Sequence, residues 1–186
     1  MDISYLQKNF SGKRVFITGH SGFKGTWLTK ILLEVGAEVL GFSKDEYRLT
    51  EEKVAKNFQS TKSDIRDAEK LKDAVLSYSP DIIFHLAAQP LVYRSYQEPS
   101  ETFSTNVQGS LNLLDAVRSS PSVRSLVFVT SDKCYENNEW VWGYREHDAL
   151  GGRDPYSASK ACAEILFNSY WQSYFEQDDS KYCSSV

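Results

Sequence analysis

The sequence predicts an α/β fold, a Rossmann-like doubly wound parallel sheet with helices on both faces. Short apolar runs alternate with amphipathic segments of ten or more residues along the whole chain. A glycine-rich loop directly follows the first of these runs. The 186 residues, 41% hydrophobic and 25% charged, suit a globular domain with a single core.

The first quarter of the chain shows the alternation most clearly. Residues 14–18 are apolar and β-branched, which indicates a buried strand. Residues 26–35 have apolar side chains at helical spacing, and Gly36 suits the left-handed position that ends a helix. Residues 38–42 predict a second strand, and the polar stretch 43–63 predicts a loop with one turn of helix at most.

The same pattern continues after this loop. Asp67 is expected to cap a helix that Pro80 ends. The further predicted elements are strands over residues 81–86 and 125–130, helices over 101–118 and 157–174, and the start of another strand over 181–186. We expect residues 1–180 to form one α/β domain and residues 181–186 to begin a further strand.

Composition narrows the class of protein. The net charge of −4 gives no basic excess, which argues against nucleic-acid binding. Neither a signal peptide nor a membrane-spanning run is recognisable, and the three cysteines have no disulfide or zinc spacing. The three histidines are scattered as well, so we predict no metal site and a soluble cytoplasmic protein with reduced thiols.

The loop after the first strand has the pattern Gly19-x-x-Gly22-x-x-Gly25. Gly19 permits a tight turn, Gly22 lets the backbone approach a pyrophosphate, and Gly25 lets the helix pack closely on the strand. The N-terminus of the following helix offers free N–H groups to the phosphates. The strand–loop–helix context therefore predicts a dinucleotide site.

The end of the second strand leaves the choice of dinucleotide open. Ser43 and Lys44 stand where an acidic residue would bind the ribose of NAD, and Asp45 comes slightly late. Lys44 and Arg48 can reach a 2′-phosphate or can be solvated loop charges.

Tyr156 and Lys160 form a second constellation. Residues four apart share one face of a helix, so the phenol and the ammonium can point into one site. A tyrosine has a pKa near 10, and a nearby cation favours its phenolate, which makes Tyr156 a workable base. Such a pair alone is common on solvated helices. It indicates a catalytic site here because the glycine loop is expected at the same end of the sheet.

Two polar segments lie between these motifs. Ser131, Asp132 and Lys133 directly follow a strand, where open α/β sheets place ligands, although a plain polar turn fits equally. Residues 140–146 are rich in aromatic side chains and can form a lid over the substrate or a hydrophobic plug. We favour the lid, because the segment lies between the two catalytic motifs.

Four motifs together resemble the extended short-chain dehydrogenase/reductase family. They are residues 18–25 (TGHSGFKG), 85–89 (HLAAQ), 105–109 (TNVQG) and 156–160 (YSASK). Within that family, further segments resemble the nucleotide-sugar 4,6-dehydratases that act on CDP-glucose. These segments are residues 88–96, 131–137 and 140–146. Sister dehydratases for dTDP-glucose and GDP-mannose typically carry Asp-Glu where this chain has Asp132-Lys133.

The resemblance implies a three-step lyase reaction. Tyr156, helped by Lys160 and Ser131, would take the proton of the C4 hydroxyl while hydride passes from C4 to the cofactor. Lys133 would remove the C5 proton, and Asp132 would protonate the departing C6 hydroxyl. The cofactor would return its hydride to C6, giving CDP-4-keto-6-deoxyglucose.

The resemblance also assigns ligand contacts. Besides Tyr156 and Lys160, the implied cofactor-binding residues are Gly19, Gly22, Phe23, Lys24, Gly25, Asp64, Ile65, Leu86, Ala87, Ala88 and Thr105. On position alone, Asp64 is nearly as well explained as a helix cap or a surface carboxylate. The implied sugar contacts are Gln89, Arg94, Tyr144 and Arg145.

The resemblance further implies NAD as the cofactor, with NADP left open, and a role in deoxysugar and lipopolysaccharide biosynthesis. It implies that residues 1–180 form a dinucleotide-binding and catalytic domain, and that residues 181–186 lead to a C-terminal substrate lobe, so that the fold is C-terminally truncated. It implies a homodimer formed through the helices predicted over residues 101–118 and 157–174. Two alternatives stay open: another NAD(P)-dependent nucleotide-sugar dehydratase or epimerase, and a truncated dinucleotide-binding module without turnover.

Overall fold

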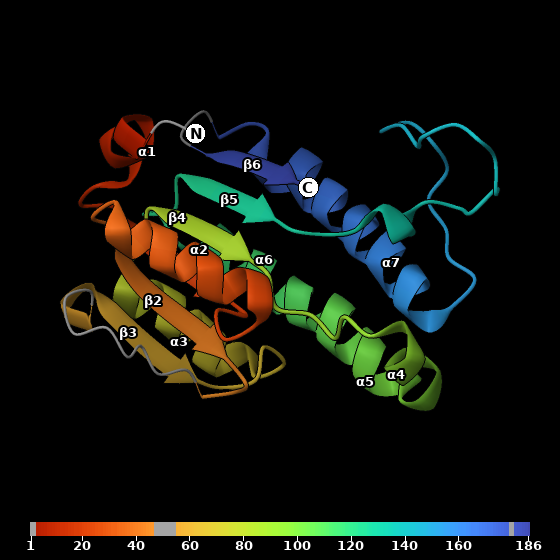
Figure 1. The fold of residues 1–186 in the computed structure, drawn as a ribbon, viewed down its shortest axis with the longest axis horizontal. Helices are drawn as coiled ribbons and strands as arrows, with labels where there is room; N and C mark the ends of the chain where they lie inside the picture. The colour runs from red at the N-terminus through yellow and green to blue at the C-terminus, as the bar shows by residue number, and fades with distance from the viewer. Residues whose placement is uncertain (1–2, 47–54, 179–180) are drawn as a thin grey trace.

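The structure, a computed structural model, describes residues 3–46, 55–178 and 181–186. Its centre is a six-stranded parallel sheet with the strand order β3-β2-β1-β4-β5-β6 (Figure 1). The strands are β1 (Arg14–Thr18), β2 (Glu38–Ser43), β3 (Phe58–Lys62), β4 (Ile82–His85), β5 (Ser125–Phe128) and β6 (Tyr182–Ser185). This order and the parallel pairing confirm the predicted Rossmann-like fold.

Helices connect the strands and cover both faces of the sheet. They are α1 (Ile3–Phe10), α2 (Phe23–Glu34), α3 (Ala68–Tyr78), α4 (Val92–Gln97), α5 (Pro99–Phe103), α6 (Gly109–Ser119) and α7 (Pro155–Tyr170). Short 3₁₀ turns span Ala55–Asn57 and Asp132–Cys134, and π turns span Ser104–Gln108 and Trp171–Phe175. Helix α2 lies on one face of the sheet, and α3 and α6 lie on the other (Figure 1).

The core follows from the alternation of side chains along β1. Phe16 packs into a cluster with Leu113 and Leu114 of α6, whereas Val15 and Ile17 pack with residues of α2 on the opposite face. All five of these side chains are fully buried. Strand β1 is thus buried on both sides, as its continuous apolar run predicts.

Most predicted elements are confirmed, with shifts of a few residues at their ends. Gly36 has the predicted left-handed backbone, with φ of +87°. Helix α2 begins three residues earlier than predicted, at Phe23. The long helix predicted over residues 101–118 is interrupted by the π turn, and α1 and α4 were not predicted.

One prediction was wrong: the stretch 43–63 is not only loop, because β3 occupies Phe58–Lys62. Its residues are mostly polar and exposed, as befits an edge strand, so they lack the apolar signal of the inner strands. Arg48, proposed as a phosphate contact, lies outside the described residues. No helix among the described residues is long and apolar enough to cross a membrane.

Candidate active site

All six strands of the parallel sheet end at one edge, and the predicted functional segments gather there. The glycine loop follows β1, residues 86–89 follow β4, and residues 131–134 follow β5. Helices α4 and α5 and the start of α7 lie beyond the same edge (Figure 1). In open α/β sheets this edge is where ligands bind.

The glycine loop is constrained at two positions. Gly19 has a φ of +73°, and a Cβ there would lie 2.7 Å from the backbone nitrogen of Ala87. A Cβ on Gly25 would lie 2.3 Å from the carbonyl oxygen of Gly19. Both positions therefore require glycine: Gly19 so that the turn passes close to Ala87 after β4, and Gly25 so that the first turn of α2 packs on the glycine loop.

The N-terminus of α2 is free of a side-chain cap. Gly22 is the N-cap residue and makes no side-chain hydrogen bond, and Phe23 and Lys24 are exposed beside it. The first-turn N–H groups are thus available to an anion, and an uncapped helix start behind a glycine turn fits a pyrophosphate. The residues present therefore fit a dinucleotide at this position.

At the end of β2, Ser43 is buried and shares a short hydrogen bond with Ser21 of the glycine loop. Lys44 is exposed and lies 3.6 Å from Glu101 of α5. At the position where the sequence predicts a ribose, Ser43 and Lys44 thus contact other protein groups.

Asp64 and Ile65 lie beside this end. Asp64 binds Arg66 through a 2.6 Å ion pair, and this hydrogen bond to the Arg66 side chain is the main reason why the pKa of Asp64 lies below its usual value. Ile65 is buried against Gly109, where a Cβ would lie 2.6 Å from its side chain. Its carbonyl accepts a hydrogen bond from Asn112 at 3.1 Å.

Tyr156 and Lys160 lie together at the start of α7. Asp154 caps this helix by accepting hydrogen bonds from the backbone and hydroxyl of Ser157, at 3.0 and 2.6 Å. Tyr156 is 8% exposed and Lys160 is 7% exposed. Burial lowers the pKa of Lys160 from 10.5 to about 8.

Asn106 is a central residue of the site that the sequence reasoning quoted within a motif but assigned no role. It lies in the π turn, is 2% exposed, and bonds both the backbone N–H and the carbonyl of Gln89, at 2.8 and 3.2 Å. Its amide also donates to Ser159 at 2.9 Å, and the Ser159 hydroxyl donates to the Tyr156 carbonyl at 2.7 Å. Asn106 thereby connects the segment after β4 to the catalytic helix. Thr105, half-buried, is its neighbour in the same turn.

The segment after β5 begins with a short 3₁₀ turn that Ser131 caps. The Ser131 hydroxyl accepts from the Lys133 backbone at 3.3 Å and donates to Asp132 at 3.2 Å. The side chains of Asp132 and Lys133 are exposed, so both are accessible to a substrate at this edge.

Two of the predicted sugar contacts are engaged by other protein groups. The Gln89 amide is buried, donates to Thr102 at 2.9 Å, and accepts from the Leu91 backbone at 2.7 Å. The Arg94 guanidinium binds the Glu101 carboxylate through two contacts of 2.8 and 2.7 Å. Their roles toward a sugar stay predictions.

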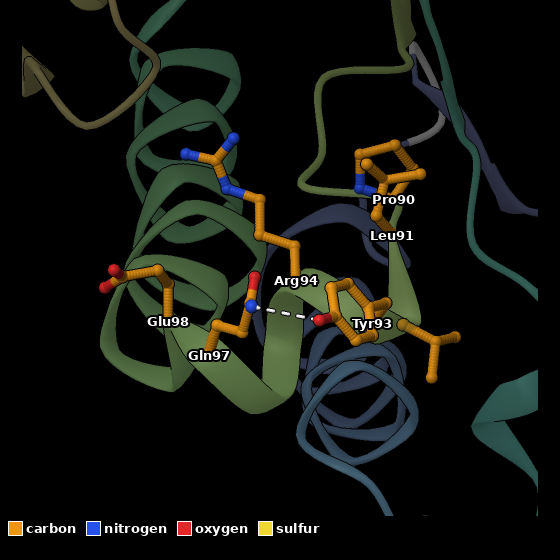
Figure 2. A pocket seen from close by; sticks show the side chains of 7 residues that line it. Pro90, Leu91, Tyr93, Arg94, Gln97 and Glu98 are labelled. Carbon is orange, nitrogen blue, oxygen red and sulfur yellow. Dashed lines mark hydrogen bonds between the residues drawn. The ribbon is translucent and has the colours of Figure 1, made fainter.

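Arg94 also lines an open hollow of about 570 Å³ on the outer side of α4. Figure 2 shows this hollow with Tyr93 and Gln97, which share a 3.2 Å hydrogen bond, and with Glu98 at the far end of the helix. Its lining residues all lie between positions 90 and 98, so it is separate from the row of Tyr156 and Lys160 on α7.

The aromatic segment 140–146 stands out as a loop between β5 and α7 (Figure 1). Val141 is 90% exposed and Trp142 is 71% exposed, so neither side chain packs into the core formed by the described residues. Tyr144 stacks on Tyr135 with centroids 5.4 Å apart and donates its hydroxyl to Asn137 at 3.2 Å. Arg145 is exposed, and a lid function for this loop stays a prediction.

Comparison with known proteins shows that the chain is similar to the N-terminal half of enzymes named for sugar-nucleotide reactions. It is 50% identical over 175 residues to the CDP-glucose 4,6-dehydratase of Salmonella typhimurium, covering 91% of this chain and 49% of that protein. It is 28% identical over 174 residues to a probable dTDP-glucose 4,6-dehydratase of Sinorhizobium fredii, covering 87% and 50%. The chain thus spans about half the length of the curated relatives it matches.

Solved structures give the same picture. The fold matches DesIV, a dTDP-glucose 4,6-dehydratase from Streptomyces venezuelae solved with NAD, with a TM-score of 0.74 and 29% identity over 86% of this chain and 52% of DesIV. It matches the epimerase Mth375 of Methanothermobacter thermautotrophicus with a TM-score of 0.82 and 25% identity, covering 98% and 53%. These matches confirm the resemblance to extended short-chain dehydrogenases/reductases. The family model for GDP-mannose 4,6 dehydratase matches residues 16–179, and the chain therefore belongs to that family.

Proposed function

We propose that this chain is the cofactor-binding and catalytic part of a nucleotide-sugar 4,6-dehydratase that converts CDP-glucose to CDP-4-keto-6-deoxyglucose. One observation carries the proposal: Tyr156 and Lys160 lie buried on one row of α7, at the sheet edge where the glycine loop starts α2. The 50% identity to a CDP-glucose 4,6-dehydratase supports the choice of substrate.

NAD is the proposed cofactor, since DesIV, a relative of the same fold, was solved with NAD. When bound, it accepts a hydride from the sugar and later returns it. The uncapped start of α2 would hold its pyrophosphate, and residues Leu86–Ala88 would line its path along the sheet edge. Ser43 supplies no carboxylate for a ribose, so NADP stays within the proposal as the alternative.

The side chains of this site can move the protons that the reaction needs. Tyr156 would accept the proton of the C4 hydroxyl, assisted by the ammonium of Lys160 and a hydrogen bond from Ser131. Lys133 would remove the C5 proton that the neighbouring 4-keto group acidifies, and Asp132 would protonate the departing hydroxyl. The exposed positions of Asp132 and Lys133 leave both free to meet a sugar at the sheet edge.

Incubation of the chain with NAD and CDP-glucose, followed by mass spectrometry, tests this proposal. Loss of one water from the sugar nucleotide, absent in Tyr156→Phe, is the expected result. Parallel incubations with dTDP-glucose and GDP-mannose test the nucleotide. A C4-inverted product of unchanged mass would contradict dehydration and support the epimerase alternative.

A dinucleotide-binding module without turnover is the second candidate. The observation that favours it is that the chain spans about half the length of its curated relatives. NAD binding measured by calorimetry, together with an unchanged sugar nucleotide, would support this candidate. Joining the chain to the C-terminal half of the Salmonella typhimurium relative should then restore water loss.

We also propose a homodimer and a cytoplasmic location. Exposed apolar side chains on or next to the two helices expected at the dimer contact support the first: Phe103 is 37% exposed, Ile165 is 58% exposed and Tyr174 is 48% exposed. The free thiols of Cys134, Cys162 and Cys183 suit a reducing compartment. Sedimentation at several protein concentrations tests the dimer, and Ile165→Asp should shift it toward monomer.

A further inference from the structure

Glu164 continues the row of catalytic candidates on α7 and has no part in the reaction proposed above. Tyr156, Lys160 and Glu164 follow one another at intervals of four residues, which places them on one side of the helix. Glu164 is half-buried, so its carboxylate is partly withdrawn from solvent. The partners of this side chain indicate what it does.

The first partner, Thr130, lies two residues after the end of β5 and directly before the candidate segment 131–133. The Thr130 hydroxyl donates a short hydrogen bond to Oε1 of Glu164. The Thr130 backbone N–H donates to the carbonyl of Val186 at 2.6 Å, which ties the same residue to the end of β6. Because residues 131–133 leave the sheet directly after Thr130, the bond to Glu164 joins that segment to α7.

The second partner is Lys160. Its ammonium is influenced by Glu164 on the same helix, by Lys24 on α2, by Cys134 after β5 and by His85 at the end of β4. His85 is neutral because burial lowers its pKa to about 3, and Cys134 keeps its proton because burial raises its pKa to about 11. Lys24 repels the ammonium. Among these four groups, Glu164 is the only carboxylate and favours the charged amine.

We infer that Glu164 is a positioning residue that fixes the segment after β5 against α7 through Thr130 and places its carboxylate on the same side of α7 as Lys160, four residues away. The inference rests on the proposed function for the roles of Tyr156 and Lys160. The effect of Glu164 on the titration of Lys160 can be measured without any enzymatic turnover. A protonated Lys160 matters because only the cation favours the phenolate of Tyr156.

The test is a titration of the full chain labelled with ¹³C at lysine Cε and followed by NMR. The Lys160 signal is identified by its loss in Lys160→Met and should titrate with a midpoint of about 8 in the unmodified chain. Glu164→Gln keeps the size of the side chain and removes its charge. It should lower that midpoint by roughly one pH unit, the effect of losing a neighbouring opposite charge. Glu176→Gln, at an exposed residue beyond the π turn, is the matched control and should leave the midpoint unchanged.

Thr130→Val separates the two parts of the inference, because it removes the hydrogen bond and leaves the carboxylate in place. Amide hydrogen exchange at residues 131–133 should then become about tenfold faster, as expected when a local contact is lost. An unchanged Lys160 midpoint in Glu164→Gln, or unchanged exchange in Thr130→Val, overturns the corresponding part. Should Glu164→Gln fail to fold, Glu164→Ala also removes the charge and should give a Lys160 midpoint below that of the unmodified chain. Absence of water loss with these couplings intact would count against the proposed function alone.

Discussion

The Thr18 hydroxyl donates a 2.7 Å hydrogen bond to Nδ1 of His85. The direction follows from its other partners, since the backbone N–H groups of Leu86 and Ala87 both point at the same oxygen from 3.2 Å. His85 therefore carries its proton on Nε2 and donates to Ser110 at 3.0 Å. This arrangement pins the end of β1, where the glycine loop starts, to the end of β4.

Thr18→Val should destabilise the chain strongly although it preserves shape. It removes the acceptor of the Ala87 N–H and the hydroxyl partner of the buried His85 Nδ1, while the Leu86 N–H keeps its 3.1 Å bond to the Thr18 carbonyl. We expect the free energy of unfolding to fall by about 3 kcal/mol. Urea unfolding measures the loss. Thr18→Ser keeps the hydroxyl and should recover most of it, and equal losses in both variants would contradict the role of the hydrogen bonds.

Gly25→Ala tests whether the glycine loop is as tight as its geometry indicates. The new Cβ would lie 2.3 Å from the Gly19 carbonyl, so the loop or α2 must move, at a cost of at least about 2 kcal/mol in unfolding free energy. The displaced loop should also bind NAD more weakly, which calorimetry can measure. Gly143→Ala is the control, because a Cβ there meets nothing within 4 Å.

Lys160 makes stability depend on pH in a defined window. Its pKa is about 8 in the folded chain against 10.5 ordinarily, so the unfolded chain binds more protons between these values and stability rises with pH across them. Lys160→Met should therefore be more stable below pH 8, by at most about 3 kcal/mol. Urea unfolding at pH 7 and pH 10 checks this, and a gain that does not shrink at pH 10 would refute it.

Lys133→Met tests the base proposed for the elimination step. The exposed side chain has room for the change, so substrate binding should stay within about twofold while kcat falls about 100-fold, a typical loss for a general base. Water loss followed by mass spectrometry at several CDP-glucose concentrations separates the two parameters. Lys72→Met on the exposed side of α3 controls for the change in net charge. Equal losses in kcat and in substrate binding would count against the assigned role.

The sequence-based predictions succeeded where the structure depends on a local pattern of residue types. Apolar β-branched runs predicted β1 within its observed bounds, and Gly36 predicted the end of α2, because these signals are local. Strand β3 was missed because an edge strand needs no apolar run. The role of Asn106 depends on a π turn and on contacts with segments far away in the sequence, which periodicity does not encode. The Arg94–Glu101 pair depends on how α4 packs against α5, which periodicity does not encode either.

The pairing of β1 with β4 sets an order of assembly. Thr18 faces His85 in the sheet register, and the turn at Gly19 closes against Ala87. During synthesis, the glycine loop emerges long before these partners, with β2 and β3 in between. A growing chain that ends before Ala87 therefore has the complete glycine sequence and still lacks the surface that shapes it, so affinity for a dinucleotide should be acquired only after β4 has left the ribosome.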